Sequence, residues 1–117
     1  MRRNLALAAL AAFVLAGCSA IGAGHAREEA ASVCRDYAVF WLDVGDGRYT
    51  IEEMGEQMTS LQERARATGD AALTRYLVAM YDPATDKWST LEEWASMAVR
   101  VAKTCETYGV AIATSAP

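Results

Sequence analysis

Apolar residues recur at three- and four-residue spacing in four segments of the chain, and this spacing places them on one face of an α-helix. The segments cover approximately Arg27–Asp43, Ile51–Thr68, Ala71–Tyr81 and Thr90–Tyr108. The last segment has the most regular stripe, which consists of Leu91, Trp94, Ala98, Val101, Cys105 and Tyr108. No segment alternates between apolar and polar residues for long enough to predict a β-strand. The pattern therefore predicts an all-α protein.

Residues that favour helix ends lie between these segments. Thr50 lies three positions before Glu53, and Thr90 lies three positions before Glu93, which is the spacing of a capping box. Gly69 follows the second segment and favours the left-handed conformation that ends a helix. The connections are short, so successive helices are expected to run antiparallel. We therefore expect a small antiparallel four-helix bundle.

The first 18 residues follow a different pattern. A basic start is followed by an apolar run, residues 5–15, that is too short to span a bilayer, and Leu15-Ala16-Gly17-Cys18 closes the segment. This segment strongly resembles the lipobox signal peptides of bacterial lipoproteins. The resemblance implies that residues 1–17 are removed and that Cys18 is lipidated. It also implies that the mature protein is anchored on the extracytoplasmic face of a cell membrane.

The remaining chain divides into three parts. Residues 18–26 hold the lipidated cysteine and a run of small residues, which we expect to form a flexible tether. Residues 27–109 are expected to form one helical domain, because a chain of this length builds one core and not two. Residues 110–117 have neither caps nor periodicity, and we expect them to be disordered.

Two further cysteines are placed for a disulfide bond. Cys34 lies near the start of the first predicted helix and Cys105 near the end of the fourth, and these positions meet at one end of an up-down-up-down bundle. Because disulfides persist outside the cytoplasm, we expect Cys34 and Cys105 to be bonded. The alternative is a pair of buried free thiols.

Charge excludes two kinds of contact. Without the leader, nine basic residues stand against fifteen acidic ones. Nucleic-acid binding and adhesion to anionic lipid both need clusters of Lys and Arg. We therefore expect no nucleic-acid partner, and we expect the lipid anchor alone to hold the protein at the membrane.

The connections that point away from the membrane collect aromatic and acidic residues. The aromatic candidates for partner binding are Trp41, Tyr49, Tyr81 and Trp88, and the acidic residues near them are Asp43, Asp46, Asp82 and Asp86. Such a mixture favours a cationic or amphipathic partner, for which an envelope protein is the expected source. The alternative is that the rings complete the helix stripes and belong to the core. Trp88 fits this alternative least, because it lies in a connection.

One connection partly resembles the calcium-binding loop of an EF-hand. Asp82, Asp86 and Glu93 stand at positions 1, 5 and 12 of a twelve-residue loop. Position 3 is Ala84 and position 6 is Lys87, where an EF-hand has an oxygen ligand and a glycine. Turn and capping roles explain the same acidic residues. We therefore expect neither calcium nor another metal to bind.

The helical domain lacks a general base of the usual kind. The only histidine, His25, lies in the predicted tether, so we expect neither an enzyme nor a cofactor. We predict a non-enzymatic envelope lipoprotein that binds an envelope or extracellular partner through its membrane-distal loops. One alternative is a carrier with an apolar cavity lined by Met58, Leu61, Tyr76, Met80 and Trp94. Another is a phage-encoded lipoprotein that blocks the entry of competing phage.

Overall fold

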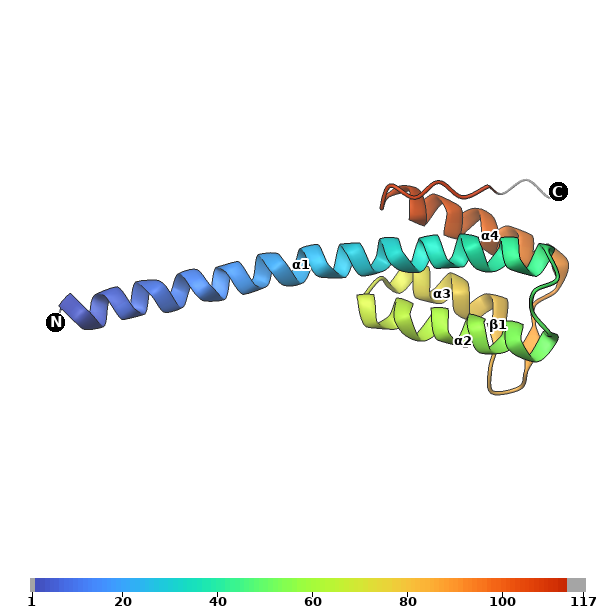
Figure 1. Cartoon of the computed structure of the whole chain (residues 1–117), viewed down its shortest axis with the longest axis horizontal. Coiled ribbons are helices and arrows are strands. Elements are labelled where there is room, and N and C mark those ends of the chain that lie inside the picture. The colour runs from blue at the N-terminus through green and yellow to red at the C-terminus, as the bar shows by residue number, and fades with distance from the viewer. Residues whose placement is uncertain (1, 114–117) are drawn as a thin grey trace.

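The computed structural model describes residues 2–113, and it describes side chains from Gly24 onward. The side chains of the predicted signal peptide and of Cys18 lie outside the described residues, as do residues 114–117 of the predicted tail. Four α-helices and one pair of short strands make up the described chain (Figure 1). The prediction of a mostly helical protein is confirmed, and the prediction that strands are absent is wrong.

Helix α1 spans Arg2–Gly45 and is the longest element. It continues through residues 19–26, where we expected a flexible tether. Three alanines in that stretch favour the helix, because alanine has the highest intrinsic helix propensity. Beyond the end of α1, Gly47 adopts a left-handed φ of 70°. The amides of Gly47 and Arg48 donate to the carbonyls of Val44 and Asp43, each at 3.0 Å, which closes the helix with a Schellman motif.

Helix α2 spans Ile51–Thr68 and begins with the predicted capping box. The Glu53 amide donates to Thr50 Oγ1 at 3.2 Å, and the Thr50 amide donates to Glu53 Oε1 at 3.1 Å. Gly69 ends the helix with a φ of 80°, as predicted. Both ends of this helix are thus determined by local sequence.

Helix α3 spans Ala71–Met80 and is followed directly by a β-hairpin. Asp70 caps α3 by accepting from the Leu73 amide at 2.9 Å. Strand β1, Tyr81–Asp82, pairs antiparallel with strand β2, Lys87–Trp88. Strands of two residues are too short to show an alternating pattern, which explains why the sequence predicted only a turn here. Trp88 consequently lies in a strand opposite Tyr81 and not in a loop.

Helix α4 spans Leu91–Glu106 and begins at Thr90. Only half of the predicted second capping box forms, since the Glu93 amide donates to Thr90 Oγ1 at 3.2 Å without the reciprocal bond. At the other end, Gly109 has a φ of 77°. The Val110 amide donates to the Cys105 carbonyl at 3.0 Å, which is the long hydrogen bond of a second Schellman motif.

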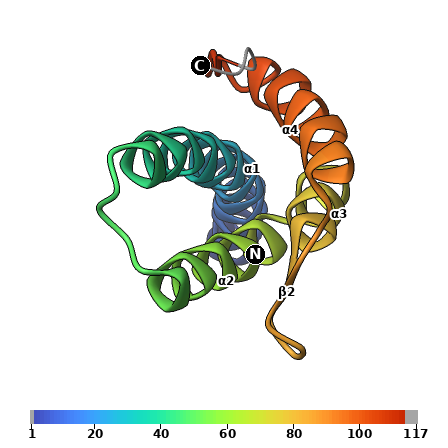
Figure 2. The same ribbon diagram turned by 90° about the vertical axis from the view of Figure 1, so that its right-hand side faces the viewer.

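Successive helices run in opposite directions, and each packs against the next (Figure 1). Helix α1 also contacts α4, although less extensively than it contacts α2. Figure 2 shows that α4 is inclined with respect to α1. The four helices therefore share one core. The sparsest contact between neighbouring helices is the one between α1 and α4.

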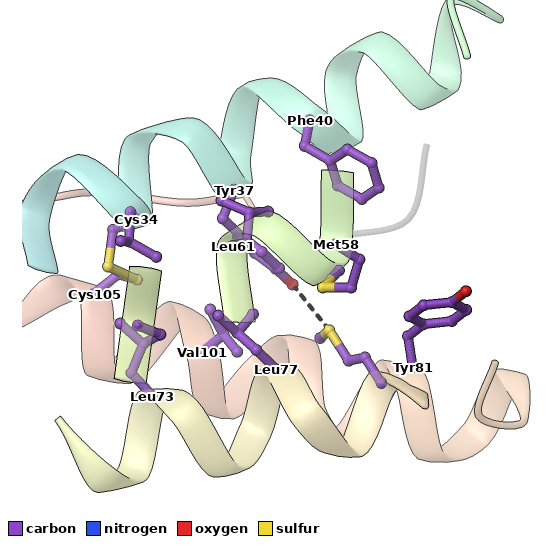
Figure 3. Packing of buried hydrophobic residues seen from close by; sticks show 13 residues of the cluster. Cys34, Tyr37, Phe40, Met58, Leu61, Leu73, Leu77, Tyr81, Val101 and Cys105 are labelled. Carbon is purple, nitrogen blue, oxygen red and sulfur yellow. Dashed lines mark hydrogen bonds between the residues drawn. A yellow bond between two sulfur atoms is a disulfide. The ribbon is translucent and has the colours of Figure 1, made fainter. Parts of the chain in front are cut away.

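All four helices contribute to one buried cluster (Figure 3). Its members are Val33, Cys34, Tyr37, Phe40, Met58, Leu61, Ala65, Leu73, Leu77, Met80, Tyr81, Val101 and Cys105. The Tyr37 hydroxyl points at Met80 Sδ, 3.9 Å away. Burial raises the pKa of Tyr37, and the nearby Trp41 indole opposes this rise to a smaller extent. Tyr37 is therefore neutral at physiological pH.

The predicted disulfide bond is present. It joins Cys34 of α1 to Cys105 of α4, whose Cα atoms are 5.7 Å apart. Both cysteines are fully buried. The bond thus connects the two helices whose contact is otherwise sparse.

The segment after α4 differs from the expected disordered tail. Val110 and Ile112 are partly buried and pack against the core cluster. The left-handed Gly109 turns the chain back, so that residues 110–113 return alongside the helices (Figure 1). The described part of the tail is therefore attached to the domain.

A buried glutamine connects α2 to the hairpin. Gln62 is fully buried, and its Nε2 donates to the carbonyls of Leu77 at 3.0 Å and Tyr81 at 2.8 Å. These carbonyls lie at the end of α3 and the start of β1, where the helix leaves its acceptors unpaired. The sequence analysis missed Gln62, although a polar residue four positions after the buried Met58 was a usable signal.

Candidate partner-binding surface

The molecule has two ends of different character. We call residues 40–56 and 81–94 the hairpin end, because they contain the α1–α2 turn, the hairpin and the first turns of α2 and α4. We call residues 24–39, 57–80 and 95–113 the disulfide end. In Figure 1 the hairpin end lies on the right, opposite the N-terminus. The aromatic candidates of the sequence analysis all belong to the hairpin end.

Aromatic rings form a continuous cluster across the hairpin end. Trp41 of α1 lies 4.9 Å from Trp94 of α4 and 6.4 Å from Trp88 of β2, as measured between ring centroids. Trp88 in turn lies 4.4 Å from Tyr81, and Phe40 lies 5.8 Å from Tyr49. All three tryptophans of the chain are thus gathered at one end.

The exposure of the aromatic candidates decides between the two roles that the sequence left open. Tyr81 is only 6% exposed and belongs to the core, as the alternative proposed. Trp41, Tyr49 and Trp88 are half-buried and pack against that core. This packing covers most of the surface area of the three rings. The rings therefore form the base of the candidate partner-binding surface, and they are not its outermost contacts.

The Tyr81 side chain makes a hydrogen bond within the hairpin and lies against α2. The Tyr81 hydroxyl donates to Asp86 Oδ1 at 2.6 Å. This hydrogen bond is the largest cause of the raised pKa of Tyr81, and burial of the ring is the second. Gly55 of α2 makes room for the ring, because a Cβ atom there would lie 2.6 Å from the Tyr81 hydroxyl oxygen. Asp86 itself has a φ of 52°, which is uncommon for a residue other than glycine.

Some polar atoms of the cluster have no hydrogen-bond partner. Among the described residues, four side-chain atoms are buried without a partner, and three of them lie here: the indole nitrogens of Trp41 and Trp94 and the Ser89 hydroxyl. The fourth is Gln62 Oε1, which belongs to the disulfide end. A buried unpaired donor costs about 1–3 kcal/mol. Where α1, β2 and α4 meet, more buried polar groups therefore lack a hydrogen-bond partner than in a typical protein core.

The ends of the predicted apolar stripes are exposed at this surface. Leu91 belongs to the predicted stripe of the last helix, yet it is 80% exposed, and Ile51, the first residue of the second predicted helix, is 69% exposed. Leu42 is also 69% exposed. Ile51 and Leu91 are the first residues of their helices, where the chain has not yet reached the core. The spacing of the apolar residues predicted the correct face of each helix. It did not predict at which residue the packing of that face against the core ends.

The two ends of the molecule also differ in their charge. The hairpin end carries nine carboxylates and two basic side chains, Arg48 and Lys87. The disulfide end carries six carboxylates and seven basic side chains. The net negative charge of the domain is thus concentrated at the hairpin end, around the aromatic cluster.

Two of the three carboxylates that resembled a calcium loop, Asp82 and Asp86, have local partners. Asp82 accepts from the Ala84 amide and from the Thr85 hydroxyl, each at 3.0 Å, and Asp86 accepts from Tyr81. Within the described side chains, no group of three His, Cys, Asp or Glu residues is arranged to hold a metal ion. These bonds are the turn roles that the sequence offered as the alternative to calcium.

The residues suggested to line a ligand cavity are part of a packed core. Met58 and Met80 are fully buried, and Leu61 is 4% exposed. Two surface grooves lie on the described part of the molecule, one between α1 and α2 and the other between α2 and the hairpin. Of the five suggested residues, only Leu61 borders either groove.

No helix among the described residues combines the length and apolarity that a membrane crossing requires. Comparisons with protein-family models, with characterised proteins and with solved structures gave no match.

Proposed function

We propose that this protein is a lipid-anchored, non-enzymatic lipoprotein of the bacterial cell envelope that binds a partner protein through its hairpin end. The helical part is proposed to be an antiparallel four-helix bundle, since successive helices alternate in direction and all four contribute to one core. The acyl chains on Cys18 attach the protein to the membrane, and the bundle presents the acidic, aromatic end to the partner.

The observation that carries this proposal is the buried Cys34–Cys105 disulfide bond. Disulfides persist in exported proteins and are rare in the cytoplasm, so the bond supports the export that the lipobox-like leader predicts. Cys34 follows Cys18 by 16 residues, which is about 24 Å of helix at 1.5 Å per residue. The anchor therefore approaches the domain from the disulfide end, and the hairpin end faces away from the membrane.

Charge supports the same orientation. The nine carboxylates of the hairpin end are repelled by an anionic membrane surface, while the nearly neutral disulfide end is not. Helix α1 is continuous between the predicted anchor and the domain, so it holds the hairpin end at a distance from the lipid. A protein oriented in this way presents its exposed leucines to other envelope components.

The anchor is tested by intact mass and by metabolic labelling with palmitate. The mature chain is expected to begin at Cys18, to carry at least two acyl chains and to be two mass units lighter than its reduced form. The Cys18→Ser variant is the control and is expected to lose the label. A wild-type protein with an unmodified Cys18 would overturn the proposal.

Partner binding is tested by photo-crosslinking in the producing cells. A photoreactive residue in place of Asp46 or Pro83 lies at the hairpin end, and one in place of Lys103 lies at the disulfide end and serves as the matched control. All three positions are exposed, so the substitutions leave the core intact. One discrete crosslinked band from the first two positions is the expected result, and its absence there contradicts the proposed role of this end.

A further inference from the structure

We infer that the hairpin end docks an amphipathic, basic segment of a partner protein and that Leu42 and Leu91 make the main apolar contacts. The inference rests on the proposed function and adds the chemistry of the partner. It places the docking surface on the side of the hairpin end where α1 and α4 meet.

The first argument is the location of the exposed apolar residues. Leu42, Ile51 and Leu91 are each 69% exposed or more, and the other large exposed hydrophobic residues of the described chain are 52% exposed or less. All three belong to the hairpin end. Burial of exposed leucine side chains is favourable, so a partner that covers two of them gains a substantial part of its affinity there.

The second argument is the position of the two leucines beside the tryptophan pair. Trp41 and Trp94 connect α1 to α4 with their rings 4.9 Å apart. Leu42 directly follows Trp41, and Leu91 precedes Trp94 by three residues, so it lies on the same side of α4. Both leucines thus lie within three positions of the tryptophan pair, at the hairpin end of the two helices that the pair joins.

The third argument is charge complementarity. Asp43 and Asp46 follow Leu42, and Glu92 and Glu93 follow Leu91, so both leucines have carboxylates next to them. The whole hairpin end has nine carboxylates against two basic residues. Lys and Arg side chains flanking an apolar stripe match this arrangement, because rim charges steer association and the apolar centre supplies the affinity.

The same charges argue against other occupants. An anionic lipid surface is repelled by this end of the molecule. A second copy would bring two strongly acidic ends together, and like charges at an interface cost several kcal/mol. A basic amphipathic segment of another protein satisfies both the charge and the exposed leucines.

The three tryptophans make the test direct, because their emission reports on this surface alone. The full-length lipidated chain in a non-ionic detergent is titrated with a synthetic 16-residue helical peptide that has leucines on one face and lysines on the other. Saturable binding with a change in tryptophan emission is expected. The Leu42→Ser/Leu91→Ser variant is expected to bind about tenfold more weakly.

The matched control is the Val39→Ser/Val99→Ser variant. Val39 and Val99 lie on the same two helices and are 52% and 43% exposed, but they are outside the hairpin end. Its affinity for the peptide is expected to remain within about twofold of wild type, since neither valine lies beside the tryptophan pair. Melting curves of both variants establish that the fold is intact.

Three results would overturn the inference. The first is equal affinity of the leucine variant and wild type. The second is equal binding of a peptide with the same composition but scrambled order, which means that charge alone is recognised. The third is a dimer that forms without peptide and is lost in the leucine variant, which identifies a second copy as the occupant.

The same variant separates this inference from the proposed function. If photo-crosslinks at Asp46 or Pro83 persist in cells with Leu42→Ser/Leu91→Ser, the hairpin end binds a partner by other residues and only the inference fails. If Cys18 carries no lipid, the proposed function fails whatever the peptide does.

Discussion

The disulfide end and the hairpin end of this small domain are built by different means. At the disulfide end, Cys34 and Cys105 are bonded, and fully buried Val33, Leu73 and Val101 surround them. At the hairpin end, large aromatic rings fill the space between α1 and α4 without full burial, and leucines remain exposed. The disulfide end therefore contains the covalent and more fully buried part of the domain, while the hairpin end leaves apolar side chains exposed, as the proposed partner binding requires.

A polar network adds to the stability of the disulfide end. Asp70 caps α3 and also accepts a hydrogen bond from the Tyr108 hydroxyl. The Arg27 guanidinium lies over the Tyr108 ring, 5.5 Å from its centroid, and donates to the Thr107 carbonyl at 2.7 Å. This network connects α1, the α2–α3 turn and the end of α4. At the hairpin end, two indole nitrogens and the Ser89 hydroxyl have no partner among the described residues, whereas at the disulfide end this holds only for Gln62 Oε1.

The largest effect should come from removal of the disulfide bond. It closes a loop between positions 71 apart, and the chain-entropy relation predicts a loss of about 4 kcal/mol when the bond is absent. Urea unfolding of the Cys34→Ala/Cys105→Ala variant measures this loss. Hydrogen exchange should show that α1 and α4 separate first, because few other contacts join them. An unchanged unfolding midpoint would mean that the disulfide end does not depend on its covalent bond.

The next largest effect should come from Gly55→Ala at the hairpin end. The added Cβ lies 2.6 Å from the Tyr81 hydroxyl oxygen, so the ring and the hairpin must move. Overpacking of this kind costs about 1–3 kcal/mol, which exceeds the gain of up to about 1 kcal/mol from better helix propensity. The matched control is Gly45→Ala, which meets no atom within 4 Å. Thermal unfolding of both variants should give opposite signs, and a stabilised Gly55→Ala would show that the hairpin is loosely attached.

Local sequence predicted what depends on neighbouring residues. The Thr50–Glu53 capping box and the Gly69 turn both form, because each involves residues within a few positions of one another. The disulfide could also be predicted, since helix order alone brings Cys34 and Cys105 to the same end. The four helices and their approximate bounds followed from the spacing of apolar residues.

The candidate surface was predicted less well, because exposure depends on contacts distant in sequence. The spacing of Ile51 and Leu91 is correct for a core stripe, yet no other element covers the first turns of α2 and α4. Tyr81 was a candidate for partner binding, but α2 receives its ring at Gly55. Trp88 was placed in a connection, but it lies in a two-residue strand that pairs it with Tyr81. None of these contacts has a periodic signal in the sequence.

The dependence of the free energy of unfolding on alkaline pH tests how far the well-packed core extends toward the hairpin end. Tyr37 lies where the two ends meet, and burial raises its pKa above the ordinary value of 10.0. The unfolded chain therefore loses this proton first, so the free energy of unfolding falls as pH rises above about 10, by at most about 1.4 kcal/mol per pH unit. The stability contribution is fully present at lower pH. Urea titrations between pH 9 and pH 11 measure the slope.

Two phenylalanine variants complete this pH experiment. Tyr37→Phe should reduce the alkaline slope, because one of the groups that ionise on unfolding is gone, while Tyr81 and Tyr108, whose pKa values are also raised, retain part of it. Tyr76→Phe should not flatten it, since hydrogen bonding by Arg75 lowers the pKa of Tyr76 and gives its contribution the opposite sign. An equal slope in wild type and Tyr37→Phe would show that water reaches Tyr37, and hence that the well-packed region ends before it.

The smallest effect should come from charge on α2, which extends from one end to the other. Glu52 and Glu56 are four residues apart at the hairpin end, where like charges repel, so Glu56→Gln should stabilise the domain by about 0.2–0.5 kcal/mol. Glu63 lies at the disulfide end, three residues before Arg66, and Glu63→Gln should destabilise it by a similar amount. Urea unfolding at low salt resolves the two signs, and salt should reduce both effects. If both variants were destabilised, the carboxylates of the hairpin end would be part of its own packing, and the charge argument for a basic partner would lose its basis.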